Sequence, residues 1–162
     1  MPAVQVTIVR DVHHAQNVIN IKKNINEMMN MRMHEAVEYL KAKIKIKLTG
    51  TRTGQEYYIA GIGRHIASAP GEPPARMLGK LSDSIFANVT NMQTVIEGEV
   101  GSALKVDGWL LPLILELGRY MNGFVAPRPF LRSTFMEELP TLIRILKGHK
   151  NIGGLAPTTM RR

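Results

Sequence analysis

The side chains best suited to chemistry in this chain are its histidines and its neighbouring acids. His13 and His14 are adjacent, so their side chains diverge on a helix or a strand, and no carboxylate lies at chelating spacing. His34 and Glu35 lack the second histidine of the helical zinc-protease motif. We therefore interpret these histidines as surface residues and expect no metal site.

Paired acids can perform hydrolysis when several of them converge on one site. Glu97 and Glu99 share a face if their segment is a strand, but no other acid is marked as converging on them. Glu137 and Glu138 open an expected helix, where negative charge is favourable in any case. Cysteine is absent, which excludes disulfides, thiolate catalysis and cysteine-ligated metals. The sequence predicts no enzymatic activity and no cofactor, and an acid-dependent nuclease is the weakest of three functional hypotheses.

Two glycine-containing segments superficially suggest a nucleotide site. "GIGRHI" holds only half of a dinucleotide fingerprint and lacks a parallel βαβ unit around it. "LGKLS" has a Gly-Lys pair without the upstream glycine and the adjacent hydroxyl residue of a phosphate-binding loop. Neither segment predicts nucleotide binding.

The formal net charge of +8 and the pI near 10.0 favour an acidic partner or nucleic acid. No aromatic residues interleave with the basic ones, as base stacking would require. A small, basic, non-specific nucleic-acid-binding protein is therefore the alternative function. The candidate contacts to DNA or to an acidic partner are Lys41, Lys43, Lys45 and Lys47.

The elements that must position these residues follow from hydrophobic periodicity. Residues 4–8 alternate as a short strand, and a long helix from about Val18 to Leu48 is expected, broken once near Asn24 or Asn30 and capped by Gly50. Residues 55–68 read as an extended segment or hairpin, 75–85 as a short helix, and 86–102 as two antiparallel strands with a turn at Asn91. A closing helix should run from about Pro129 to Lys147.

These elements predict an α+β fold, with a long N-terminal helix and a C-terminal helix packed on a small, mainly antiparallel sheet. We expect one domain over residues 1–148 and a flexible basic tail over 149–162. The start shows no signal peptide, and the longest apolar run, "GWLLPLILELG", is far short of the roughly 20 residues of a membrane span. The expectation is a soluble protein of intracellular type that does not contact membranes.

Two features need a physical explanation. Proline restrains its own φ and the residue before it, so "APRPF" forms a stiff lead-in to the closing helix. Glu116 interrupts an apolar run, which is tolerable if its carboxylate reaches solvent, binds backbone amides or pairs with an arginine. Arg119, Arg128 and Arg132 are the candidate arginines, in the same chain or in a neighbouring copy.

Taken in order, several motifs resemble the tail-component family of long-tailed bacteriophages, the neck or tail-completion proteins. They are a proline loop, a Gly-x-Leu-x-x-Ser-Ile segment, a Val-Gly-Ser strand end, a Glu-x-Gly pair and a Pro-x-Pro-Phe-Leu-Arg helix start. In this chain the motifs are "PGEPP" at Pro70–Pro74, "GKLSDSI" at Gly79–Ile85, "VGS" at Val100–Ser102, "ELG" at Glu116–Gly118 and "PRPFLR" at Pro127–Arg132. The resemblance covers roughly residues 60 to 145, and it departs from the family at Arg119, where threonine is common.

The resemblance implies a structural role at the head–tail junction of the virion, after assembly in the host cytoplasm. The protein would form a homo-oligomeric ring with six- or twelve-fold symmetry that joins the connector to the tail tube. Its neighbours would be connector or stopper proteins and tail-tube or terminator proteins, and genomic DNA would pass through the lumen. The residues expected at the subunit or neighbour interface are Pro70, Gly71, Glu72, Pro73, Pro74, Glu116, Gly118, Arg119, Pro127, Arg128, Pro129, Phe130, Leu131 and Arg132.

Overall fold

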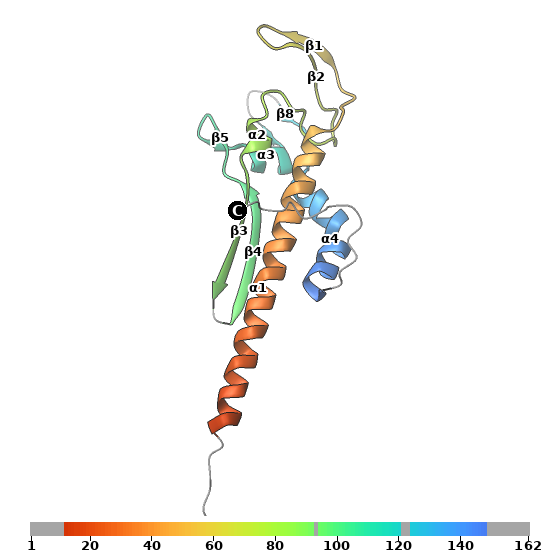
Figure 1. The fold of residues 1–162 in the computed structure, drawn as a ribbon. Coiled ribbons are helices and arrows are strands. Elements are labelled where there is room, and N and C mark those ends of the chain that lie inside the picture. Colours follow the sequence, from red (N-terminus) through yellow and green to blue (C-terminus); the bar gives the residue numbers. More distant parts are fainter. Residues whose placement is uncertain (1–11, 93, 121–123, 149–162) are drawn as a thin grey trace, which may run out of the picture.

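The computed structural model describes residues 12–92, 94–120 and 124–148 (Figure 1). The strand expected at 4–8 and the tail expected at 149–162 lie outside these residues. Two long helices, two short ones and four antiparallel hairpins among the described residues confirm the α+β class. No helix in the described ranges is long and apolar enough to cross a membrane.

Helix α1 (Val12–Thr49) is the longest element of the described fold. It is continuous, so the break expected near Asn24 or Asn30 is wrong. The helix contains no proline or glycine, and asparagine costs well under about 1 kcal/mol inside a helix. Its C-terminal half buries one face, formed by Ala36, Val37, Leu40, Ile44 and Leu48.

The hairpin of β3 (Ile85–Met92) and β4 (Val95–Ser102) packs on one side of α1 (Figure 1). The pairing runs from Ile85↔Ser102 to Met92↔Val95, so Asn91 is paired with Ile96 inside the hairpin and the turn expected there is wrong. Gly98 allows the close approach, because a Cβ there would lie about 2.5 Å from Val37 Cγ1 and 2.6 Å from Met33 Sδ.

Helix α4 (Leu131–Lys147) packs on another side of α1 and buries Thr134, Leu142 and Ile145 against it (Figure 1). The helix begins two residues after the expected Pro129, with Phe130 at the position before the first turn. Its C-terminus ends at Gly148, whose φ of 79° is left-handed. Arg32 Nη1 donates to the Leu146 carbonyl at 3.2 Å, which ties this end of α4 to α1.

The smaller elements gather at the C-terminal end of α1 (Figure 1). Helix α2 is only Lys80–Asp83, shorter than the helix expected over 75–85, because Gly79 before it is left-handed with φ 78°. Helix α3 covers Leu111–Leu117. Three short hairpins complete the described fold. They pair β1 (Glu56–Ile59) with β2 (Gly63–Ile66), β5 (Lys105–Val106) with β6 (Trp109–Leu110), and β7 (Arg119–Tyr120) with β8 (Phe124–Val125). No two of the four described hairpins join into one sheet.

Polar contacts join α1 to α4, and we call the residues that make them (Tyr39, Lys43, Lys47, Ser133, Glu137 and Glu138) the polar seam. Tyr39 Oη donates to Glu138 Oε2 at 2.6 Å, and Lys43 Nζ lies 3.3 Å from Glu138 Oε1. Lys47 Nζ donates to Glu137 Oε1 at 2.7 Å and to Ser133 Oγ at 3.0 Å. The Tyr39 hydrogen bond, with help from Lys43, lowers the pKa of Glu138, and the Glu138 carboxylate raises the pKa of Lys43.

The seam makes stability depend on pH. Because the folded-state pKa of Glu138 is lowered, its contribution is present above the ordinary glutamate pKa of about 4.3 and is lost as pH falls through the folded value. Glu138→Gln should therefore lower the free energy of unfolding at pH 7 by about 1–2 kcal/mol. The difference in the free energy of unfolding between the variant and the natural protein should shrink below pH 4. Glu137→Gln, at a more exposed carboxylate, is the control and should cost less than about 1 kcal/mol. Urea titrations at pH 7 and pH 3.5 measure both, and equal losses at the two pH values would contradict the assignment.

Candidate assembly site

The two proline-rich segments expected at an interface lie against each other. The Gly71 N–H donates to the Pro127 carbonyl at 3.3 Å, and Arg128 Nη2 donates to the Ser68 carbonyl at 3.4 Å. The Arg128 N–H donates to the Leu115 carbonyl at 2.6 Å, which adds α3 to the contact. We call residues 68–74 together with 126–130 the proline junction.

Glu72 holds the first segment of the proline junction in shape. Its Oε1 accepts from the Thr53 hydroxyl at 2.6 Å, and its Oε2 accepts from the Thr53 and Ala69 N–H groups at 3.1 and 2.9 Å. These bonds, the Thr53 hydroxyl first, lower the pKa of Glu72. The loop is therefore braced by bonds within its own chain.

Arg52 connects the proline junction to the end of α1. Its guanidinium donates to the Pro74 carbonyl at 3.0 Å and to the Lys47 carbonyl at 2.7 Å. Burial lowers the pKa of Arg52. Gly50, expected as the cap, does not adopt a left-handed conformation; Arg52 donates to the Lys47 carbonyl at this helix end, and the Thr49 hydroxyl donates to the Ile46 carbonyl.

Glu116 stabilises the start of α4. Its Oε1 accepts from the N–H groups of Phe130 and Leu131 at 2.8 and 2.6 Å. Amides in the first turn have no partner inside a helix, and negative charge is favourable there. Backbone amides are thus the partners of Glu116, and neither Arg128 nor Arg132 pairs with it within the described residues.

The glycine of the Glu-x-Gly pair, Gly118, has a conformational role. It ends α3 with φ 71°, a left-handed value that favours glycine, and its N–H donates to the Ile114 carbonyl at 2.8 Å. The next residue, Arg119, lies in β7, and its side chain lies outside the part of the structure that is described. The turn at Gly118 directly follows the helix whose Glu116 reaches the amides of α4.

The expected interface residues divide by exposure. Phe130 is fully buried and belongs to the core of its own chain, so it is no anchor into a neighbour. Leu131 is half-buried and packs on the same core, and Pro74 is buried. The remaining residues of the set whose side chains are described are half-buried (Glu72, Pro73, Glu116, Gly118, Arg128, Pro129) or exposed (Pro70, Gly71, Pro127, Arg132).

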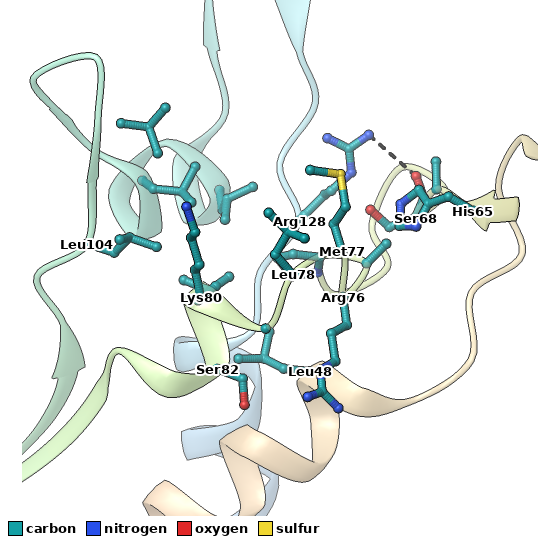
Figure 2. A pocket seen from close by; sticks show the side chains of 18 of the residues that line it. Leu48, His65, Ser68, Arg76, Met77, Leu78, Lys80, Ser82, Leu104 and Arg128 are labelled. Carbon is teal, nitrogen blue, oxygen red and sulfur yellow. Dashed lines mark hydrogen bonds between the residues drawn. The ribbon is translucent and has the colours of Figure 1, made fainter. Parts of the chain in front are cut away.

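A pocket of about 510 Å³ lies beside the proline junction (Figure 2). Leucines from α1, α2 and α3 supply much of its apolar lining, including Leu48, Leu81 and Leu115. Its charged lining residues are all basic: Arg76, Lys80, Lys105 and Arg128. We call it the basic pocket.

Two of these cations are best placed to bind a ligand. In Figure 2 the side chains of Lys80 and Arg128 extend to one side of the chain, whereas Arg76 extends away from them. The Nε of Arg128 is buried and has no hydrogen-bond partner among the described residues. A buried, unpaired guanidinium nitrogen costs free energy unless an acceptor reaches it. The arrangement suits a carboxylate carried on an apolar segment.

Sequence reasoning found Arg128 but missed Arg76, Lys80 and Lys105. Lys80 was visible only as part of an incomplete phosphate-loop pattern. Arg76 lies on the loop before α2, Lys80 on α2 and Lys105 on β5. Only tertiary structure brings the three residues beside Arg128. No sequence spacing marks that convergence.

The four lysines of α1 do not form one free cationic face. Lys43 and Lys47 pair with Glu138 and Glu137 of α4, and Lys41 pairs with Glu38 at 3.1 Å. Residues two apart point to different sides of a helix, which is why the sequence run does not become a single surface. Among these four, Lys45 alone has no ion pair within the described residues.

The described residues hold no group of three or more His, Asp or Glu side chains that could bind a metal ion. His65, which lines the basic pocket, packs edge-on against Tyr57 with ring centroids 5.4 Å apart. What the site offers chemically is recognition of negative charge.

Models of protein families, curated proteins and solved structures were each compared with the chain, and none of them matches it.

The cap on α4 can be tested directly. Glu116→Ala should lower the free energy of unfolding by about 1–2 kcal/mol, the usual cost of a lost helix cap. For a domain of this size that corresponds to a fall in Tm of about 2–8 °C. Glu116→Gln keeps one acceptor oxygen and should lose less. Thermal unfolding followed by circular dichroism measures both, and an unchanged Tm in Glu116→Ala would show that the two short hydrogen bonds contribute nothing.

Proposed function

We propose that this protein is a non-enzymatic structural subunit of the head–tail junction of a long-tailed bacteriophage. It assembles into a ring of six or twelve copies that joins the connector to the tail tube and lets DNA pass. The proposal takes its starting point from the ordered motifs that resemble the tail-component family. The fold adds a physical reason for those motifs to occur together.

One observation carries the proposal: the motif segments are bonded to one another. Ser84 Oγ lies 2.7 Å from Ser102 Oγ, which links the Ser-Ile segment to the Val-Gly-Ser strand end. The proline loop bonds to the Pro127 segment through Gly71, and the Glu-x-Gly pair bonds to the start of α4 through Glu116. These bonds join motifs that are far apart in sequence in two groups, and residues of three of the motifs, Pro74, Gly79–Ser82 and Arg128, line the basic pocket.

The basic pocket and the proline junction suit docking to a neighbouring subunit. A pocket whose charged lining is wholly basic favours an acidic segment, and electrostatic complementarity of this kind selects and orients a partner. The braced proline loop loses little conformational entropy when it docks. A pocket on one face that receives a different surface of the next copy is a heterologous contact, which closes into a ring when the rotation allows.

The fold gives little support to the alternative function, that of a non-specific nucleic-acid-binding protein. Lys41, Lys43 and Lys47 are occupied by acids of the same chain, so the densest basic run does not offer a free phosphate-binding face. A ring lumen requires only weak contacts that let DNA slide. The positive charge is compatible with that role.

Native mass spectrometry of concentrated protein, with negative-stain images of the same sample, tests the proposal. Closed particles of six or twelve copies are expected. A chain that stays monomeric at all concentrations and binds duplex DNA with an affinity that falls steeply with salt would contradict the proposal and favour the alternative.

The basic pocket gives a sharper test. Arg128→Ala and Lys80→Ala should each weaken ring formation at least about tenfold, because a hydrogen bond between charged groups contributes about 1.5–3 kcal/mol. The Arg128→Ala monomer should lose less than about 1 kcal/mol of stability, since its bond to Ser68 is long at 3.4 Å. Arg144→Ala, an exposed arginine outside the pocket, is the matched control. Normal rings from both pocket variants would exclude the pocket as the docking site.

A further inference from the structure

The N-terminal half of α1 carries an uncovered apolar stripe. Val18, Ile21, Ile25 and Met28 follow one another at spacings of three, four and three residues, which places them along one side of the helix. Their exposed fractions lie between 42% and 58%. Figure 1 shows that the first turns of α1 extend past both the β3–β4 hairpin and α4. We call these four residues the α1 stripe.

The same molecule contains an apolar groove elsewhere. The groove has a volume of about 490 Å³ and lies between α1, β4 and α4. Met33, Val37 and Leu40 of α1 line it, and Phe135 and Ile143 of α4 remain 42% exposed along it. We call it the α1–α4 groove.

We propose that the α1–α4 groove of one subunit receives the α1 stripe of a second copy of this chain. The inference rests on the proposed ring function and names the two surfaces that make one of its contacts. The contact must be intermolecular: α1 is one unbroken helix that itself lines the groove, so its N-terminal half cannot fold back into the groove of its own chain. Stripe and groove are different surfaces, so the contact can be repeated head to tail around a ring, and it can also be made twice in a reciprocal two-fold pair.

The lengths of the two surfaces agree. From Val18 to Met31, another exposed apolar residue, α1 advances about 20 Å at 1.5 Å per residue. The α4 wall of the groove runs from Leu131 to Leu146, about 22 Å by the same measure. A single helical segment can therefore lie along the whole groove.

One pair of opposite charges lies beside the two surfaces. The groove is lined by one acid, Glu99, and one base, Arg132. The projecting part of α1 carries Lys22, together with Lys23 and Glu27, which pair with each other. Neither Lys22 nor Glu99 has an ion pair within the described ranges, so these two opposite charges are available to each other. The length of the groove and this one pair of charges favour a second copy of the chain as its occupant.

Cysteine cross-linking tests the contact, and no natural thiol can compete, because the natural chain has no cysteine. Val18→Cys or Ile25→Cys protein is mixed with Phe135→Cys or Ile143→Cys protein and oxidised mildly. We expect at least one of the four mixtures to give a disulfide-linked dimer at five-fold or more the yield of either variant alone. Ile46→Cys is the matched control, since Ile46 is an equally exposed isoleucine of α1 that lies in neither surface. Its mixture with Phe135→Cys should stay at background, and circular dichroism checks that every variant is folded.

The outcomes separate this inference from the proposed function. Closed rings without a mixed disulfide in any of the four combinations would overturn the groove contact and leave the ring standing. A mixed disulfide in a sample that forms no closed ring would support the contact and count against the ring. A disulfide dimer formed by Ile25→Cys alone, at the yield of the mixtures, would show that two α1 helices pair with each other, which overturns the inference.

Discussion

The architecture around the candidate site depends on one carboxylate that satisfies the first amides of α4. Glu116 accepts from the N–H groups of Phe130 and Leu131, and Phe130 then enters the core cluster that contains Ile44 and Ile85. Because Glu116 belongs to α3, the same bonds hold α3 against the start of α4. Leu111 and Leu115 of α3 line the basic pocket, so the shape of the pocket depends on this cap as well.

The fold was predictable from the sequence where a local pattern dominates. Alternation and periodicity correctly indicated the long helix, the hairpin of residues 85–102 and the closing helix, and hence the α+β class. Several errors were local: α1 runs unbroken past Asn24 and Asn30, Arg52 rather than Gly50 takes the Lys47 carbonyl, and Gly79 is left-handed, which shortens α2. Tertiary contacts decide the rest. The partner of Glu116 was one of three stated alternatives, and only the approach of α3 to α4 selects the backbone amides.

The candidate site was predictable only in part, for the same reason. The proline segments and Arg128 were identified from their own residue types, whereas Lys80 and Lys105 join Arg128 through folding alone. The α1 lysines show the reverse case. As a sequence run they suggest one cationic surface, but Glu137 and Glu138, about ninety residues later, occupy two of them. Charge counted along a chain therefore overstates the charge that remains free on its surface.

The described residues leave two apolar surfaces exposed, the α1 stripe and the α1–α4 groove, and the basic pocket is open as well. The three surfaces are different from one another, so we propose that contacts between them repeat head to tail from copy to copy. Electron cryo-microscopy of the concentrated protein tests this central claim most directly. The account predicts closed six- or twelve-fold particles in which α1 of each subunit lies in the groove of the next. Two-fold symmetric pairs joined through identical surfaces, with groove and pocket still open, would contradict it.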